Sequence, residues 1–199
     1  MAEAVPLVLI HGLWDTPRVF HRLLRELDHR RDPLLLPHLP HGLGSRPLLE
    51  LAQRLDEAIQ ATFGPEQPID LLGFSMGGVI ARSWIQLLGG APRTRRFISV
   101  GSPHQGTLAA VPWPRLLLAG VADMKPGSSL LERLNADLDP LRRIDCCSFY
   151  TLTDLTVFPG WLGVLPVGRC QLLPVLRHDR LLKAPQSLKP LLSELLRPS

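Results

Sequence analysis

Short runs of consecutive apolar residues alternate along the chain with longer stretches in which apolar residues recur every three or four positions. The short runs predict buried parallel strands, because a strand that is covered on both faces has no polar side. These runs are residues 5–10, 34–36, 69–73, 97–100, 148–152 and 170–173. The periodic stretches predict amphipathic helices, at residues 17–27, 48–63, 79–85, 129–135 and 188–196. This alternation predicts an α/β fold, a mostly parallel sheet of about six strands with helices on both faces.

The whole chain, residues 1–199, is expected to form a single domain, because its length suits one core and no linker or internal repeat interrupts it. The least regular stretch lies at about residues 104–126, where proline and glycine interrupt the apolar positions. It is interpreted either as a small lid or as a surface excursion, which leaves the fold with a minimal cap or none.

A serine flanked by glycines lies between the third predicted strand and the helix that follows it. The residues Gly73-Phe74-Ser75-Met76-Gly77 match G-x-S-x-G in the strand–turn–helix context that this motif requires. The two glycines remove side chains that would clash in so sharp a turn, and the turn lifts the serine hydroxyl beside a helix N-terminus. Ser75 is therefore the candidate nucleophile. The alternative is a glycine-rich connection with an incidental serine.

A serine nucleophile needs a base to take its proton and an acid to orient that base. His178 follows the last predicted strand, and Asp154 follows the strand before it. Because the carboxyl ends of parallel strands share one edge of the sheet, His178 is the predicted base and Asp154 its partner. The competitors are His104, which follows an earlier strand, and Asp145, which begins its strand at the opposite edge. For Asp154 an Asx turn is the structural alternative.

The oxyanion of an acyl-transfer reaction needs two backbone N–H donors. The candidates are Met76, directly after the serine, and Leu13, in the loop after the first strand. His11 is expected to hydrogen-bond this loop, whereas His38 and His41 are expected to be solvated. Apolar residues on loops near this edge are candidates for substrate binding, with ordinary core or lid packing as the alternative for each. They are Trp14, Trp113, Val157, Phe158 and Trp161.

The net charge of +4 comes mostly from small groups of arginines, such as Arg30-Arg31, Arg93/Arg95/Arg96 and Arg142-Arg143, which are interpreted as solvated surface. Because there is no long basic run and no nucleic-acid motif, nucleic acid is not an expected partner, although a weak preference for anionic surfaces is compatible with the charge. The histidines and cysteines lack metal-ligand spacing, and no dinucleotide fingerprint is present. Neither a metal nor a cofactor is therefore expected.

The first residues lack the basic region and cleavage site of a signal peptide, and the apolar run at residues 116–122 is too short to cross a bilayer. The three cysteines, two of them adjacent, do not form a disulfide framework and are predicted to be buried thiols. A cytoplasmic protein without a transmembrane segment is expected, and transient contact with a lipid surface is compatible with this composition.

In their order along the chain, these motifs resemble the α/β-hydrolase superfamily, and within it the small bacterial class-2 lipases and esterases with a minimal cap. The resemblance covers nearly the whole chain and implies a Ser-Asp-His triad, no cofactor, and cleavage of carboxylic esters through an acyl-enzyme. The loop after the first strand departs from the pattern, because it reads His-Gly-Leu-Trp and is not glycine-rich. The motifs that carry the resemblance are residues 8–12, 73–78, 101–107, 124–128, 153–154 and 178.

The sequence therefore predicts a serine carboxylester hydrolase, an esterase or lipase that acts on a small-molecule or lipid acyl ester. An acyltransferase, which passes the acyl group to an alcohol or thiol, and a thioesterase are alternatives that use the same triad. A non-catalytic binding module on a hydrolase scaffold is a further alternative, against which the complete set of triad residues argues.

Overall fold

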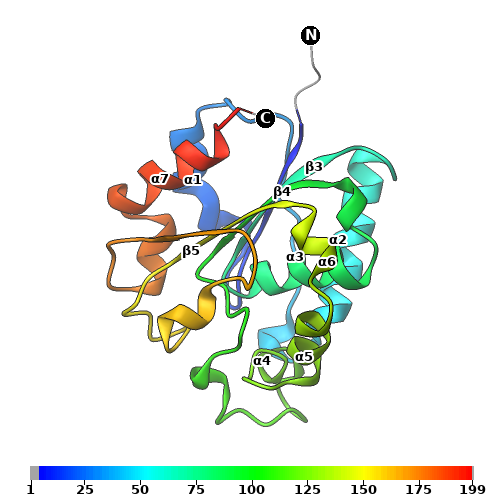
Figure 1. The fold of residues 1–199 in the computed structure, drawn as a ribbon, viewed down its shortest axis with the longest axis vertical. Helices are drawn as coiled ribbons and strands as arrows, with labels where there is room; N and C mark the ends of the chain where they lie inside the picture. The colour runs from blue at the N-terminus through cyan, green and yellow to red at the C-terminus, as the bar shows by residue number, and fades with distance from the viewer. Residues whose placement is uncertain (1–4, 199) are drawn as a thin grey trace.

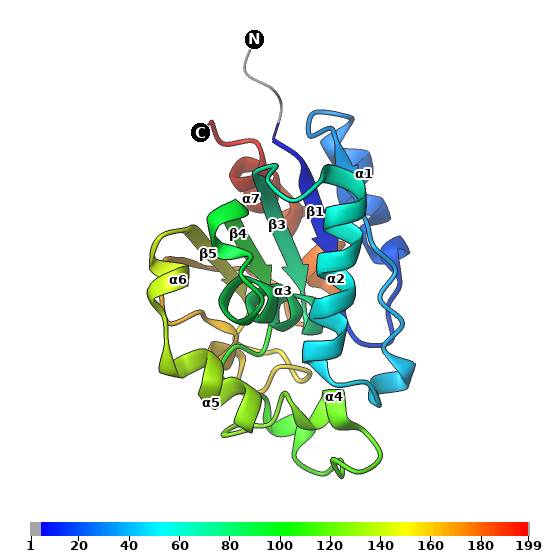
Figure 2. The same ribbon diagram turned by 90° about the vertical axis from the view of Figure 1, so that its right-hand side faces the viewer.

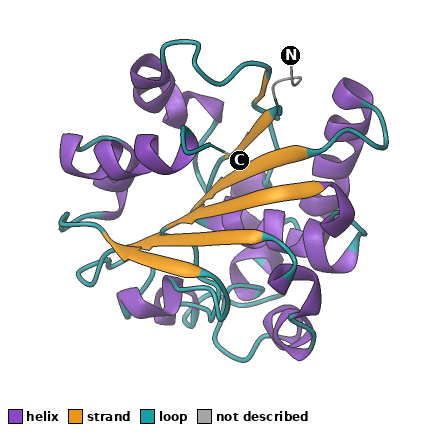
Figure 3. Cartoon of the chain, turned by 45° about the horizontal axis from the view of Figure 1, so that its top comes forward, coloured by secondary structure: helices purple, strands orange, loops and turns teal. Residues whose placement is uncertain are grey.

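The computed structural model describes residues 5–198, which form a single six-stranded sheet in which every neighbouring pair of strands is parallel. The strand order is β2-β1-β3-β4-β5-β6. Figure 3 shows the sheet as one layer with helices packed on both sides. The parallel six-stranded α/β architecture predicted from the sequence is thus confirmed. The strands are β1 (Leu7–Ile10), β2 (Leu34–Leu35), β3 (Ile69–Phe74), β4 (Thr94–Val100), β5 (Asp145–Tyr150) and β6 (Arg169–Leu172).

Helices α2, α3, α5 and α6 cover one face of the sheet, and α1 and α7 cover the other (Figures 1 and 2). None of the helices in the described part of the chain is long and apolar enough to cross a bilayer. The α-helices are α1 (His21–Leu27), α2 (Leu48–Phe63), α3 (Met76–Leu87), α4 (Ala119–Ala122), α5 (Ser129–Ala136), α6 (Asp139–Arg142) and α7 (Pro185–Leu195). Short 3₁₀ helices are η1 (Pro17–Phe20), η2 (Gly42–Gly44), η3 (Ala91–Arg93), η4 (Leu108–Ala110), η5 (Gly160–Gly163) and η6 (His178–Leu182).

Alternate residues of the central strands contribute to two separate hydrophobic cores. In β1, Val8 and Ile10 join the core beneath α2 and α3, whereas Leu7 and Leu9 join the core beneath α1 and α7. All four side chains are fully buried. A strand with both faces covered must be apolar at every position, which explains the uninterrupted apolar runs of the sequence.

The carboxyl ends of the strands meet at one edge of the sheet, and the loops that leave this edge carry the candidate catalytic residues. In Figure 2 the strands run downward to this edge, and the excursion that contains α4 lies at the same end of the molecule. Parallel α/β sheets bind their ligands at this edge. The loops begin at residues 11, 75, 101, 151 and 173.

The segment at residues 104–126 is a short excursion whose base is tied to the body of the protein. The Thr107 N–H donates to the Met124 carbonyl at 2.8 Å, and the Thr107 hydroxyl donates to the Thr156 carbonyl at 2.8 Å. At the far end of the segment, Asp123 accepts a hydrogen bond from the Leu48 N–H at 2.9 Å. Between these anchors the sequence predicts only a loop, whereas the structure contains η4 and α4.

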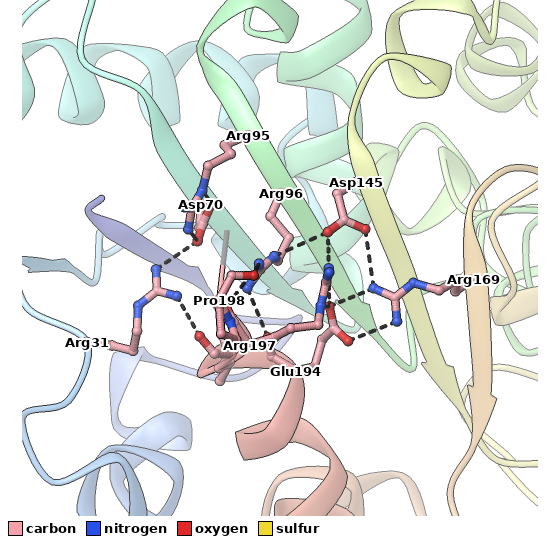
Figure 4. A network of polar contacts seen from close by, with 10 residues as sticks. Arg31, Asp70, Arg95, Arg96, Asp145, Arg169, Glu194, Arg197 and Pro198 are labelled. Carbon is pink, nitrogen blue, oxygen red and sulfur yellow. Dashed lines mark hydrogen bonds and ion pairs between the residues drawn. The ribbon is translucent and has the colours of Figure 1, made fainter. Parts of the chain in front are cut away.

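At the opposite edge of the sheet, three of the arginines interpreted as solvated surface, Arg31, Arg95 and Arg96, form part of an ion-pair network (Figure 4). The carboxylate of Asp70, which is buried in β3, accepts from Arg31 at 2.8 Å and from Arg95 at 2.6 Å. Arg96 is itself buried and lies 3.4 Å from Asp145. The interpretation is wrong for these arginines because it considered only their neighbours in sequence, and their carboxylate partners come from other elements.

The three cysteines also differ from one another. Cys146 and Cys147 are buried in β5, as predicted, whereas Cys170 is exposed because β6 is an edge strand.

Candidate active site

Ser75 occupies the turn between β3 and α3 with a backbone conformation that is costly for a residue with a side chain. Its φ is +54° and its ψ is −127°. The turn is held by a hydrogen bond of 2.8 Å from the Ser75 N–H to the Val100 carbonyl at the end of β4. Backbone strain of this kind persists only where the surrounding structure imposes it, and it concentrates at functional sites.

The two glycines that flank this turn are required by close approach of the backbone. A Cβ atom at residue 73 would lie 2.4 Å from Gly78 Cα, and one at residue 77 would lie 2.1 Å from the Ile10 carbonyl oxygen. Both contacts are with main-chain atoms, so they cannot be relieved by rotating a side chain. The steric reason for G-x-S-x-G inferred from the sequence is therefore present in the structure.

Asp154 and His178 form a hydrogen-bonded pair although they lie on different loops. His178 Nδ1 is 2.6 Å from Asp154 Oδ2. Asp154 is buried, and its other oxygen, Oδ1, accepts from the N–H groups of Thr156 at 2.8 Å and Val157 at 3.0 Å. Because a carboxylate can only accept, Nδ1 carries the proton of a neutral imidazole and Nε2 is left with its lone pair.

Threonine hydroxyls connect the loop of Asp154 to the loop of His178. The Thr151 hydroxyl donates to the Val175 carbonyl, and the Thr153 hydroxyl donates to the Leu176 carbonyl at 3.1 Å. Both acceptors lie within three residues before His178. These bonds fix the separation of the two loops, and thereby the geometry of the carboxylate–imidazole pair.

The imidazole of His178 lies beside the serine turn. Its ring stacks on the ring of Phe74 with centroids 4.9 Å apart, and Phe74 directly precedes Ser75. His178 Nε2 is buried and has no hydrogen-bond partner among the described residues, so no hydrogen bond joins it to the Ser75 hydroxyl in this structure. Hydrogen bonds between nucleophile and base are often long or absent in free enzymes and form when substrate is bound.

Two backbone N–H groups beside Ser75 have no acceptor among the described residues. Met76 is the first residue of α3, so its N–H has no intrahelical partner. The N–H of Leu13 donates to no acceptor in the part of the chain that the structure describes. The next residue, Trp14, has a φ of +60° and directs its N–H to His41 Nε2 at 3.1 Å. The Leu13 N–H is therefore a donor in this loop that is available to a ligand.

Histidines from two segments hold the Leu13 loop in place. His11 Nε2 accepts from the Leu39 N–H at 3.1 Å, and His11 Nδ1 lies 3.0 Å from the Gly12 carbonyl. His11 thus hydrogen-bonds the loop backbone, as predicted. The prediction for His41 is wrong: it is half-buried and is an acceptor for Trp14, because the loop after β2 folds back over the loop after β1.

Asp15 is a further acidic residue at the site that sequence analysis does not identify. Burial raises the pKa of its carboxyl, while the charges of His178 and Lys183 act in the opposite direction. Gly12 lies between the two side chains. A Cβ atom at residue 12 would be 3.2 Å from Asp15 Oδ2 and 2.8 Å from Ser75 Cβ. Asp15 therefore lies next to the serine, and its position on the loop after β1 is the only signal for it in the sequence.

The apolar residues proposed for substrate binding differ in their exposure. Val157 is buried, and its N–H helps to hold Asp154. The other four are exposed, Trp14 most of all at 67%. Trp14 also lines a groove next to the Leu13 loop. The exposed four are Trp14, Trp113, Phe158 and Trp161.

The competing histidine His104 is fully buried, and its ring packs edge-on against Phe97 with centroids 6.1 Å apart. Its carbonyl accepts from Arg82 at 3.0 Å. Among the described residues, no group of three or more histidine, cysteine or acidic side chains is placed to hold a metal ion.

Comparison with known proteins agrees with the fold. Residues 5–125 match the family model described as the alpha/beta hydrolase fold. No curated protein matches the sequence.

Solved structures resemble the chain over almost its full length, at low sequence identity. The mature lipase BlEst2 of Bacillus licheniformis superposes with a TM-score of 0.73 at 16% identity, covering 98% of this chain and 93% of that one. Lipase B of Aspergillus fumigatus gives 0.75 at 14% identity, covering 96% of this chain and 52% of the lipase. The α/β hydrolase MGS-MChE2, from a lagoon-sediment metagenome of Mar Chica, Morocco, gives 0.70 at 20% identity, covering 96% and 90%. At these identities the likeness establishes a shared fold.

Proposed function

The chain belongs to the α/β-hydrolase family, and from this premise we propose that it is a serine carboxylester hydrolase that works through an acyl-enzyme. Ser75 is the nucleophile, His178 the general base and Asp154 the residue that orients it. The N–H groups of Leu13 and Met76 stabilise the oxyanion. The lipases among the structurally similar proteins are consistent with an ester substrate.

In the proposed reaction, His178 Nε2 takes the proton of the Ser75 hydroxyl as Oγ attacks the ester carbonyl. The carbonyl oxygen becomes an oxyanion that accepts from Leu13 and Met76, each donor contributing on the order of 3 kcal/mol to the transition state. His178 then gives the proton to the departing alkoxide, which leaves as the alcohol. Water, deprotonated by His178, attacks the acyl-enzyme and releases the carboxylic acid together with the restored serine.

The observation that carries the proposal is the bond of 2.6 Å between His178 Nδ1 and the buried Asp154. This bond fixes the tautomer in which Nε2 can accept a proton, and Nε2 is the ring atom without a partner among the described residues. A histidine with only a structural role is more often hydrogen-bonded at both ring nitrogens. The strained backbone of Ser75 supports the same site independently.

Hydrolysis, and not transfer of the acyl group to another acceptor, is favoured by the open surroundings of the site. Trp14, Phe158 and Trp161, on loops at this edge of the sheet, are exposed. Water can therefore reach the acyl-enzyme, whereas an acyltransferase must exclude it. The same triad would also cleave thioesters. A cytoplasmic location stays a prediction.

The test is turnover of p-nitrophenyl butyrate by the purified protein and by Ser75→Ala. The variant is expected to lose essentially all activity, because no other group can form the acyl-enzyme. Ser83→Ala removes another buried hydroxyl, on the same helix, and is expected to retain activity. Retention of most of the rate by Ser75→Ala would reject the proposal.

A further inference from the structure

A groove of about 490 Å³ lies between the oxyanion loop and the residues that follow His178. Its walls come from the first turns after β1 and from η6, and we call it the basic groove. Its volume falls within the usual range of small-molecule sites. Four cations and a single carboxylate line it: Arg18, Arg22, Arg180, Lys183 and Asp15.

The arginines of the basic groove differ from most arginines of the protein in having no anionic partner. Most arginines elsewhere donate to carboxylates or carbonyls, as in the network around Asp70 and Asp145 (Figure 4). Among the described residues, the side chains of Arg18, Arg22 and Arg180 form neither a salt bridge nor a hydrogen bond. Lys183 is only loosely engaged, with Asp179 at 3.7 Å. The groove therefore has an excess of positive charge that the protein does not neutralise.

The basic groove opens directly beside the proposed catalytic residues. Trp14 and Asp15, in its wall, belong to the loop that supplies the Leu13 N–H. Arg180 lies two residues after His178 on η6. Asp15 lines the groove and is also close enough to His178 for the charge of the imidazole to affect the pKa of its carboxyl. A substrate whose ester is held at Ser75 can thus extend a second group past Asp15 into the groove.

Apart from Trp14, the exposed apolar candidates for substrate binding lie outside the basic groove. Phe158 and the excursion at residues 104–126 are joined by a hydrogen bond of 2.8 Å from the Leu108 N–H to the Phe158 carbonyl, and exposed apolar side chains lie along this unit. An acyl chain suits this apolar side, whereas the charged groove suits the alcohol portion of the ester.

We propose that the basic groove binds a phosphate group on the alcohol portion of the substrate, so that the enzyme prefers acyl esters of phosphorylated alcohols. The inference rests on the proposed ester hydrolase function and names its substrate class. Three guanidinium groups offer more donors than one carboxylate can accept, whereas a phosphate has three oxygens and up to two charges. Asp15 repels an anion at the near end of the groove and so directs the phosphate toward the arginines.

A matched pair of soluble esters tests the proposal: 1-butyryl-glycerol and 1-butyryl-glycerol 3-phosphate, which differ only in the phosphate. The wild-type protein is expected to show a kcat/KM roughly tenfold to a hundredfold higher for the phosphorylated ester, decreasing as salt is added. In the double variant Arg18→Gln/Arg180→Gln this ratio is expected to fall toward one. Arg133→Gln removes an exposed arginine on α5 that also has no partner within residues 5–198, and it is expected to keep the wild-type ratio.

The same comparison with 1-oleoyl-glycerol and 1-oleoyl-glycerol 3-phosphate in phosphatidylcholine vesicles distinguishes the source of the phosphate. If the arginine-dependent preference is seen in the butyryl pair, the phosphate belongs to a soluble phosphorylated ester. If it is seen only in the oleoyl pair, the phosphate belongs to a lipid headgroup. Equal kcat/KM within both pairs, or a preference that survives in the double variant, would overturn the proposal.

A binding measurement separates this inference from the proposed catalytic function. With Ser75→Ala, which cannot turn the ester over, titration calorimetry is expected to detect 1-butyryl-glycerol 3-phosphate and to show a loss of affinity of roughly tenfold or more on adding Arg18→Gln/Arg180→Gln. Arginine-dependent binding without hydrolysis by the wild-type protein would reject the hydrolase function and retain the groove. Hydrolysis without arginine-dependent binding would reject only the proposal that the basic groove binds the phosphate group.

Discussion

At the residue scale, the candidate site depends on which nitrogen of one imidazole carries a proton. Asp154 receives two backbone N–H groups on one oxygen and the His178 ring on the other, so the carboxylate cannot rotate away from the ring. Nε2 therefore stays available toward the serine turn. In the proposed reaction, Asp154 orients the His178 ring and stabilises the imidazolium that forms.

Replacing the carboxylate by an amide should abolish that control. In Asp154→Asn the side-chain NH₂ can donate to Nδ1, which moves the imidazole proton to Nε2 and prevents it from accepting the serine proton. We expect kcat for p-nitrophenyl butyrate to fall by up to about 10⁴ with the fold intact by circular dichroism. Asp179→Asn changes the neighbouring, half-exposed carboxylate and should keep most of the rate. An unchanged rate in Asp154→Asn would mean that another acid orients His178.

Sequence reasoning identified the serine, aspartate and histidine as candidates because each has a local signature: a motif for Ser75, and the end of a predicted strand for Asp154 and His178. It missed Asp15 and the structural role of His41. Both depend on the left-handed turn at Trp14, which points the Trp14 N–H at a histidine 27 residues further along the chain. Such a turn at a tryptophan has no signature in residue type.

At the scale of elements, the site is assembled by hydrogen bonds between loops that leave different strands. Thr151 follows β5 and Val175 follows β6, and the Thr151 hydroxyl closes the gap between them beneath the Asp154–His178 pair. The strands themselves follow from apolar patterning, because each buried run can only be accommodated inside the sheet. The two short helices in residues 104–126 were not predicted, since helices of three or four residues carry too few periodic positions to be recognised.

Removing the Thr151 hydroxyl should separate the two loops. We expect Thr151→Val to lower kcat roughly tenfold, because the imidazole loses its defined position, while Thr151→Ser, which keeps the hydroxyl, should restore most of the rate. If Thr151 had only a structural role, Thr151→Val would be less stable in urea. Its kcat per folded molecule would then equal that of Thr151→Ser. Equal kcat values for the two variants would therefore argue against the positioning role.

A second element-scale effect concerns His104, which packs between β4 and α3. Burial, reinforced by the charge of Arg82, holds the pKa of His104 well below its usual value. As the pH falls below about 6.5, the unfolded chain gains a proton that the folded protein cannot accept, so stability is lost on the acid side. Above this pH the histidine makes no pH-dependent contribution.

This linkage can be measured by urea unfolding at pH 7.5 and pH 5.5. His104 should account for a loss of up to about 1.4 kcal/mol per pH unit below 6.5. His104→Leu, or His104→Gln if leucine does not fold, should lose correspondingly less stability between the two pH values. If the variants show the same acid-side loss as the wild type, His104 is not the responsible group.

At the scale of the whole molecule, the two edges of the sheet have different tasks. The carboxyl edge carries the exposed loops and the strained serine, and the amino edge carries ion pairs that join β3, β4, β5, β6 and α7 (Figure 4). The overall architecture could be predicted from the sequence because it follows from local patterning. The amino-edge network could not, because Asp70, Arg31 and Arg95 meet only once the chain has folded.

The burial of Asp70 in this network leads to a prediction about stability. In Asp70→Asn the guanidinium groups of Arg31 and Arg95 lose a buried counter-charge, and we expect a loss of about 3 kcal/mol in the free energy of unfolding. Asp139→Asn breaks an exposed pair with Arg142 and should cost less than about 1 kcal/mol. Urea titrations of the two variants provide the comparison, and equal small losses would show that the amino-edge pairs are dispensable.

The most direct measurement of the central claim is covalent labelling with a fluorophosphonate, followed by digestion and mass spectrometry. A single adduct is expected on Ser75. It should form rapidly in the wild-type protein and much more slowly in His178→Ala. An enzyme that hydrolyses esters yet remains unlabelled at Ser75, or labelling at Ser75 that is equally fast without His178, would contradict the claim.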